Sequence, residues 1–194
     1  MVQQKKETQL YQRLYEKLSR YATIESSTLQ ALEKILHIRT IEKEAYLSKL
    51  YENRRVIGFV LDGIIRVYHL NEEGKEYNKN FFIEGDLFMT SLNENRDSAV
   101  FVQTITESNV ILFDHQTFML LAQEDEVLEN IFNKILLEYL SKKQQREIEL
   151  LALNAKERYA LFVKNNPILS EKLPQFHIAS YLGITPTQLS RVRK

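Results

Sequence analysis

The side chains best suited to bind another molecule lie near the C-terminal end of the chain, in the stretch QFHIASYLGITPTQLSRVRK. Ala179 is small, as a residue must be where two helices cross closely, and Gly183 can supply the positive φ of a tight turn. Thr185 can cap a second helix, Pro186 suits its first position, and Gln188 would complete a capping box with Thr185. The stretch therefore predicts a helix-turn-helix.

Apolar residues at five positions would lock the two helices together, and these are Ile178, Leu182, Ile184, Leu189 and Val192. The outward positions of the second helix carry hydrogen-bond donors and no acid. Such side chains can bond DNA phosphates and the acceptor groups of guanine and adenine. We therefore predict contacts with double-stranded DNA from Thr185, Thr187, Gln188, Ser190, Arg191 and Lys194. A structural helical hairpin of the same shape is the alternative.

Charge is distributed unevenly along the chain, although the 26 Lys and Arg balance the 26 Asp and Glu. Residues 156–194 hold seven Lys or Arg and two Glu, so the C-terminal part is basic and the rest is acidic. A basic module on an acidic body indicates a polyanion-binding end. A solvated helix face is the alternative explanation of this charge.

Several classes of function are excluded or disfavoured by composition. The chain has no Cys, which excludes thiolate-held iron–sulfur clusters, cysteine nucleophiles and Cys-type zinc sites. Its five Gly form no dinucleotide-binding fingerprint. His69 lies near three glutamates, but on a predicted hairpin tip, so a solvated loop is favoured over a metal site. We expect no metal, no identified cofactor and no catalytic activity. The start lacks a signal-like apolar segment, and no apolar run could span a membrane, so a cytoplasmic protein is expected.

The N-terminal part is predicted to hold two helices followed by short strands. Leu10, Leu14 and Leu18 share one face of a helix over residues 8–20, and Ser27 with Gln30 predicts a capped second helix. Short β-branched or aromatic segments then follow, namely IGFVL, IIRVYHL, YNKNFFI, AVFVQTI and VILFD. Asp62-Gly63 and the NEEG segment are predicted hairpin turns. The pattern favours a small antiparallel barrel or jelly roll.

A helix of about 28 residues without Gly or Pro is predicted to follow Asp125, which can cap it. Two apolar stripes lie on its first half, one of Leu128, Ile131, Ile135 and Tyr139, which we assign to the dimer contact, and one of Leu136 and Leu140. A helix with more apolar surface than one barrel can cover suggests pairing with a second copy of the chain. The alternative is that both stripes pack on the barrel.

Two stretches together resemble the Crp/Fnr superfamily of bacterial transcription regulators, and their wording is similar to its Bacteroidetes-type subset. One is GFVLDGIIRVYHLNEEGKEYNKNFFIEGDLF, and the other is the predicted helix-turn-helix. The resemblance implies an α+β chain in three parts. These are a cyclic-nucleotide-binding-like jelly-roll domain with N-terminal helices over 1–123, a long dimerisation helix over 124–153, and a helix-turn-helix domain over 154–194.

The resemblance also locates a pocket for a small-molecule effector. Cyclic-nucleotide binders of this family hold the ribose with a Gly-Glu pair and the phosphate with Arg-Ser-Ala. The matching positions here are Met89 and Thr90, then Asp97, Ser98 and Ala99. We assign Met89, Thr90, Ser98 and Ala99 to the effector pocket. Because Asp97 would repel a phosphate, we expect that cyclic AMP does not bind in the family's manner and that the effector is apolar or uncharged, or that there is none.

The expected function is therefore that of a homodimeric DNA-binding transcription regulator, with RNA polymerase as a further partner implied by the resemblance. Pro186 stands where other members have an Arg, so that base contact should be missing. The family's β-wing should be absent or truncated because the sequence stops at Lys194. The alternative is a ligand-binding or protein-interaction module of the same fold that has lost specific DNA binding. A jelly-roll enzyme is disfavoured.

Overall fold

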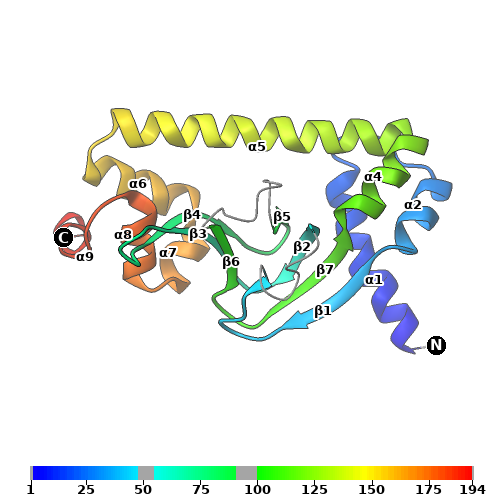
Figure 1. The fold of residues 1–194 in the computed structure, drawn as a ribbon, viewed down its shortest axis with the longest axis horizontal. Coiled ribbons are helices and arrows are strands. Elements are labelled where there is room, and N and C mark those ends of the chain that lie inside the picture. Colours follow the sequence, from blue (N-terminus) through cyan, green and yellow to red (C-terminus); the bar gives the residue numbers. More distant parts are fainter. Residues whose placement is uncertain (1, 48–54, 91–99, 194) are drawn as a thin grey trace. The chain divides into compact units, whose positions relative to one another are not determined.

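The computed structural model describes residues 2–47, 55–90 and 100–193, and it divides into two compact units (Figure 1). The first unit comprises residues 1–67 and 81–136, and the second comprises residues 68–80 and 137–194. The functional division at 1–123, 124–153 and 154–194 stays a prediction. The compact units divide the long helix between them and assign the tip of one hairpin to the C-terminal unit.

Among the described residues, the helices of the first unit are α1 (Val2–Leu18), α2 (Ser26–Glu33), α4 (His115–Glu124) and the start of α5 (Glu126–Ala152). The strands are β1 (His37–Ile41), β2 (Val56–Asp62), β3 (Ile65–Leu70), β4 (Glu76–Phe82), β5 (Leu87–Met89), β6 (Val100–Thr104) and β7 (Ser108–Asp114). Helices combined with antiparallel strands confirm the predicted α+β class.

The strands lie in two sheets, one with the order β1-β7-β2-β5 and one with the order β4-β3-β6. In the four-stranded sheet β7 pairs antiparallel with both β1 and β2, and β2 pairs antiparallel with β5. Across the described ranges the strands form two open sheets, and no closed barrel is found. The sequence left a barrel or a jelly roll open. The described strands do not form a closed barrel, and the jelly roll stays a prediction.

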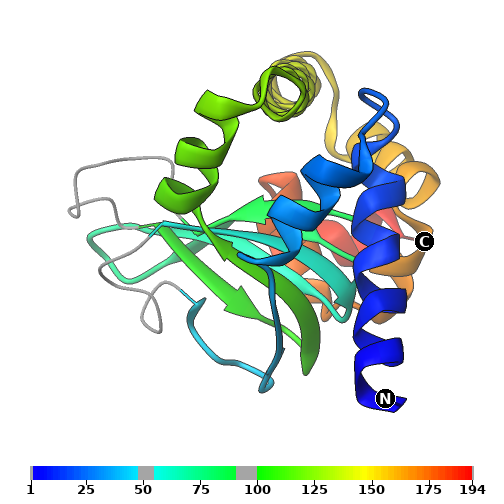
Figure 2. The ribbon, with the colours of Figure 1, turned by 90° about the vertical axis from the view of Figure 1, so that its right-hand side faces the viewer.

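Both faces of the central strand β2 are buried, which explains why it is apolar almost throughout instead of alternating. Ile57 and Phe59 on one face pack with residues of α1, α2, α4 and α5 (Figure 2). Val56 and Val60 on the other face pack with residues of the second sheet such as Ile65. A strand covered on both sides reads as a continuous apolar run.

The Asp62-Gly63 turn does not form a hairpin, because β2 and β3 belong to different sheets. Gly63 instead lies at the corner where the chain leaves one sheet for the other, with φ of +102°. A Cβ built on Gly63 would lie 2.7 Å from Cα of Ser108, closer than packing allows. Glycine is therefore required here because the backbone approaches β7 closely, and not because of a two-residue hairpin.

The second predicted turn, NEEG, does connect β3 to β4 as neighbouring strands. The Asn71 side-chain oxygen accepts from the Lys75 backbone nitrogen at 2.8 Å, and the Gly74 backbone nitrogen donates to the Asn71 carbonyl at 3.0 Å. This hairpin prediction is confirmed.

The predicted helix cap is confirmed at the start of α5 but not at the start of α2. The Asp125 carboxylate accepts from the backbone nitrogens of Val127 and Leu128, which confirms the predicted cap of α5. Helix α2 instead begins after Glu25, whose side chain makes no capping bond, so the predicted Ser27 cap is wrong. The residues from Pro167 form the short helix α7 (Pro167–Lys172), in which Pro167 takes a first-turn position that suits it.

Candidate nucleic-acid interface

The second unit is built around three further helices, α6 (Ala155–Asn165), α8 (Gln175–Leu182) and α9 (Pro186–Val192), together with α7 and the end of α5. Apolar side chains from these helices form its core, and the buried ones are Phe162, Leu169, Leu173, Ile178, Ala179, Leu182 and Leu189. Ala179 is fully buried, as expected for a small residue at a close helix crossing.

The turn between α8 and α9 has the geometry that its sequence predicts. Gly183 adopts the left-handed conformation, with φ of 67°. Its backbone nitrogen donates to the Ser180 carbonyl at 3.2 Å, and the next nitrogen, of Ile184, donates to Ala179 at 3.1 Å. These bonds use carbonyl groups that the end of α8 would otherwise leave unpaired. The turn is therefore held by the backbone itself.

Helix α9 begins with the predicted capping box. The Thr185 hydroxyl accepts from the Gln188 backbone nitrogen at 3.1 Å, and the Gln188 side-chain oxygen accepts from the Thr185 backbone nitrogen at 2.9 Å. Pro186 occupies the first position of the helix. The local predictions for this helix start are confirmed.

The outward face of α9 remains exposed and holds five of the six predicted DNA-contacting residues. Thr185, Thr187, Gln188, Ser190 and Arg191 are all exposed, while Lys194 lies outside the described residues. The side-chain oxygens of Thr185 and Gln188 already serve the cap. Thr187, Ser190 and Arg191 are thus the side chains of this face that the helix start does not use.

Thr187 and Arg191 are four residues apart, so they share one face of α9. Arg193 follows the helix and is rotated about 200° from Arg191 on a helical projection. Both arginines are exposed. They can therefore contact different parts of a bound nucleic acid, which makes the pair useful as test and control.

Two arginines attach the end of α5 to the helices that follow it. Arg158 donates to the Leu153 carbonyl at 2.6 Å and to the Leu150 carbonyl at 3.3 Å, so its charge lies at the C-terminal end of α5. The Arg146 guanidinium stacks on the Tyr181 ring at 3.5 Å and donates to the Tyr181 carbonyl. Burial lowers the pKa of Arg146. These contacts join α5, α6 and α8 within the second unit.

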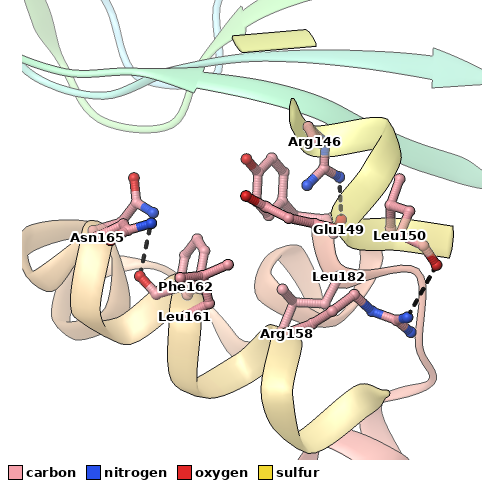
Figure 3. A pocket seen from close by; sticks show the side chains of 10 residues that line it. Arg146, Glu149, Leu150, Arg158, Leu161, Phe162, Asn165 and Leu182 are labelled. Carbon is pink, nitrogen blue, oxygen red and sulfur yellow. Dashed lines mark hydrogen bonds between the residues drawn. The ribbon is translucent and has the colours of Figure 1, made fainter. Parts of the chain in front are cut away.

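A cavity between these helices is too small for an effector (Figure 3). Its volume is about 30 Å³, and Arg146, Arg158, Phe162, Asn165 and Tyr181 are among its lining residues. That space accommodates about one water molecule, whereas ligand pockets usually measure some 300–1,000 Å³. The cavity is therefore a packing feature.

The predicted effector-pocket residues are only partly within the described ranges, since Ser98 and Ala99, like Asp97, lie outside them. Met89 is half-buried and pairs with Ile57 at the edge of the sheet. Thr90 is buried, and its hydroxyl accepts from the Val56 backbone nitrogen at 3.1 Å. Thr90 thus has a structural partner within its own sheet.

The predicted dimer residues Leu128 and Ile131 belong to the core of their own chain. They are 0% and 1% exposed, and they pack with residues of α1, α2, α4 and the four-stranded sheet. Ile135 packs against the same core, and Tyr139 is half-buried. The assignment of Leu128 and Ile131 to a partner is therefore corrected, because side chains with almost no exposed surface have nothing left to contact. The assignment of Ile135 and Tyr139, which keep some exposed surface, stays a prediction.

The opposite face of α5 carries the exposed apolar side chains. Leu137, Leu140, Ile148 and Leu151 are 65%, 60%, 51% and 82% exposed. At 100° per residue they fall within an arc of about 80°. In the sequence, this exposed stripe can be recognised from apolar residues on one helix face both before and after the polar SKKQQRE segment.

Two further observations limit the chemistry of the described part of the chain. It contains no group of three or more His, Asp or Glu side chains that could hold a metal ion. Nor is any helix within the described ranges both long and apolar enough to cross a membrane.

Comparisons with known proteins establish the fold. No family model and no curated protein sequence matches the chain. Among solved structures it is similar to FixK2 from Bradyrhizobium japonicum, with 20% identity, a TM-score of 0.68, and coverage of 82% of this chain and 83% of that one. A Eubacterium rectale protein, described as a Crp/Fnr-family transcriptional regulator, has 13% identity and a TM-score of 0.66, covering 87% and 82%.

The c-di-GMP-responsive global regulator CLP of Xanthomonas campestris is similar too, with 15% identity and a TM-score of 0.61 over 87% of this chain and 89% of that one. Identities this low show a common fold. The chain therefore has the fold of these regulators, and its function is argued from its own residues.

Proposed function

We propose that the chain is a homodimeric DNA-binding transcription regulator of the Crp/Fnr type, working in the cytoplasm and controlled by an effector in its sheet-bearing part. Three observations support the proposal. The fold is that of solved regulators, residues 156–194 are basic, and the left-handed Gly183 between α8 and the capped start of α9 is what a helix-turn-helix would need.

The observation that carries the proposal is the outward face of α9. This helix is anchored from behind by Leu189, which is 1% exposed, and is held at its start by the Thr185 cap. Its exposed face presents Thr187, Ser190 and Arg191 without any acid. A recognition helix needs this combination, because it must be rigid while its donors enter the major groove.

DNA binding is tested by fluorescence anisotropy with fragments from the region upstream of the chain's own gene, at several salt concentrations. Specific binding should weaken steeply as salt rises, since phosphate contacts release counterions. Arg191→Ala should cost about 1–3 kcal/mol on the preferred site and flatten the preference at one base pair. Arg193→Ala is the matched control and should leave the base preference intact.

The alternative, a ligand-binding or protein-interaction module of this fold, makes a different prediction in the same assay. It requires that no upstream fragment binds better than random DNA, even at low salt. Equal losses on every sequence for Arg191→Ala would instead reduce that residue to a phosphate contact.

We propose that dimerisation uses the exposed stripe of α5, namely Leu137, Leu140, Ile148 and Leu151. An exposed apolar stripe of this length gains free energy when it packs on a second copy. Leu140→Glu should convert the dimer to a monomer in light scattering. Leu120→Glu, at a leucine of α4 that is 58% exposed, is the control and should leave the mass unchanged. A monomeric wild-type chain at micromolar concentration would contradict the proposal.

We also propose that the effector is a molecule other than cyclic AMP. The Met89 side chain offers no carboxylate for ribose hydroxyls, and the Thr90 hydroxyl is already bonded to the backbone of Val56. Isothermal titration calorimetry with cyclic AMP should give no heat of binding. Micromolar affinity would contradict this part of the proposal.

A further inference from the structure

The tip of the β3–β4 hairpin, residues 68–80, packs on α8 within the second unit. The backbone nitrogen of Asn78 donates to the Ser180 hydroxyl at 2.9 Å, and that hydroxyl donates to the Glu76 carbonyl at 2.9 Å. A hydroxyl has one proton to donate, so Ser180 uses its donor and an acceptor position on the same hairpin strand. One side chain of α8 thus bridges two backbone groups about a hundred residues away in the sequence.

A second set of bonds fixes the same hairpin to the preceding turn of α8. Asn78 is 4% exposed, and its side-chain nitrogen lies 3.1 Å from the His177 carbonyl and 3.2 Å from the His177 Nδ1. An amide nitrogen can only donate, so this arrangement requires Nδ1 to be the unprotonated ring nitrogen. His177 is 8% exposed. The bonds are therefore largely shielded from water, and breaking them would strand buried polar groups.

Helix α8 is consequently held on more than one side. Ile178, Ala179 and Leu182 face the core that it shares with α9. His177 and Ser180 face the hairpin. The contacts on the hairpin side leave the outward face of α9 exposed, so they orient the helix pair and do not cover it.

The hairpin is also continuous with the second sheet. Strand β3 runs through Ile65–Leu70 and β4 through Glu76–Phe82, and β3 neighbours β6 in that sheet. Residues 76–78 thus belong to the same strand, β4, that continues into this sheet. From there, the bonds to His177 and Ser180 lead to α8.

We propose that Asn78, His177 and Ser180 form a clasp through which the β3–β4 hairpin sets the orientation of the helix-turn-helix. While the clasp is closed, the hairpin tip and the α8–α9 pair move as one body. An effector that shifts β3 or β4 then moves the DNA-reading helix with them. The link to DNA rests on the proposed function, but the clasp itself can be measured without DNA.

The test is hydrogen exchange of the free protein by NMR, comparing wild type with Ser180→Ala. Alanine favours a helix, so α8 should remain folded, as far-UV circular dichroism can verify. The Asn78 amide and the amides of α8 that face the hairpin should exchange roughly 3–10 times faster, the range expected for one lost hydrogen bond. Asn78→Ala, which removes the other half of the clasp, should accelerate the same amides.

The matched control is Ser170→Ala. The Ser170 hydroxyl also donates to a carbonyl, that of Pro167 at 2.8 Å, but within its own short helix α7. Its loss should leave the exchange of Asn78 unchanged. If Ser180→Ala also leaves that amide unchanged, no clasp exists and the inference is overturned.

DNA affinity supplies the second measurement. Ser180→Ala should weaken binding to the preferred site by about 3–10-fold without altering base preference, because ordering the released helix pair offsets part of the binding free energy. Faster exchange with unchanged affinity would overturn the coupling. A wild-type chain that binds no DNA would defeat the proposed function. In that case the clasp is tested by hydrogen exchange alone. The amides of the hairpin and of α8 must then exchange faster together in both Ser180→Ala and Asn78→Ala.

Discussion

The α8–α9 pair and the two sheets obtain their shapes from different sources. In the helix pair, the turn glycine, the cap and the first proline act on neighbours within a few residues of themselves. In the sheets, a strand's partner can lie far along the chain, as Ile57 pairs with Phe113. The region that would touch DNA is therefore encoded locally, whereas the region that would sense an effector depends on contacts that only the folded chain provides.

The largest effect expected from this difference concerns two glycines with positive φ. Gly63→Ala should lower the free energy of unfolding by roughly 2–5 kcal/mol, since a strained backbone is combined with a clash against Ser108. Gly183→Ala should cost only about 1–2 kcal/mol, because the nearest atom to its Cβ would be a Leu150 methyl at 3.6 Å. Urea unfolding followed by circular dichroism measures both. Equal losses of unfolding free energy in the two variants would mean that backbone strain alone, without the Ser108 clash, determines the cost of each substitution.

The order of elements could be read from the sequence, but the pairing of strands could not. Most strands could be predicted from their β-branched and aromatic composition. The NEEG turn and the Asp125 cap could be predicted too, from residues that favour turns and helix starts. Asp62-Gly63 looked like a hairpin because the motif is the same whether the next strand pairs with the previous one or leaves for another sheet. Only Ser108, on β7, distinguishes the two outcomes.

The candidate site shows the same division. The exposed face of α9 was predictable, since each residue's direction follows from the helix start at Thr185. The covered residues of α5 could not be told from the exposed ones, because Leu128 and Leu140 are equally apolar in sequence and differ only in what covers them. No pattern indicated Asn78, whose partners His177 and Ser180 are about a hundred residues away.

An intermediate effect is expected at two of the helix starts for which the sequence predicted caps, those of α9 and α2. Thr185→Ala should lower the free energy of unfolding by about 1 kcal/mol, because the Gln188 backbone nitrogen loses its acceptor. Ser27→Ala should change it by less than about 0.5 kcal/mol, since Ser27 lies inside α2 and caps nothing. Thermal unfolding of both variants measures the difference. A larger loss for Ser27→Ala would show that α2 begins where the sequence first suggested.

The smallest effect tests whether the second unit, too, depends on long-range contacts. Burial, then Lys79 on the hairpin and Arg146, lower the pKa of Lys143 from 10.5 to about 8. Between these values the unfolded chain holds a proton that the folded chain has released, so this lysine makes stability rise with pH. Lys143→Met should therefore stabilise the protein at pH 7, by up to about 1 kcal/mol, and remove that part of the rise. Urea unfolding at pH 7 to 10 measures it, with Lys142→Met as the control for removing a charge from the same helix. If Lys79→Met in the hairpin also reduces the rise, a residue 64 positions away influences the pKa of Lys143 on α5. An unchanged pH dependence in Lys143→Met would show that Lys143 does not cause the rise.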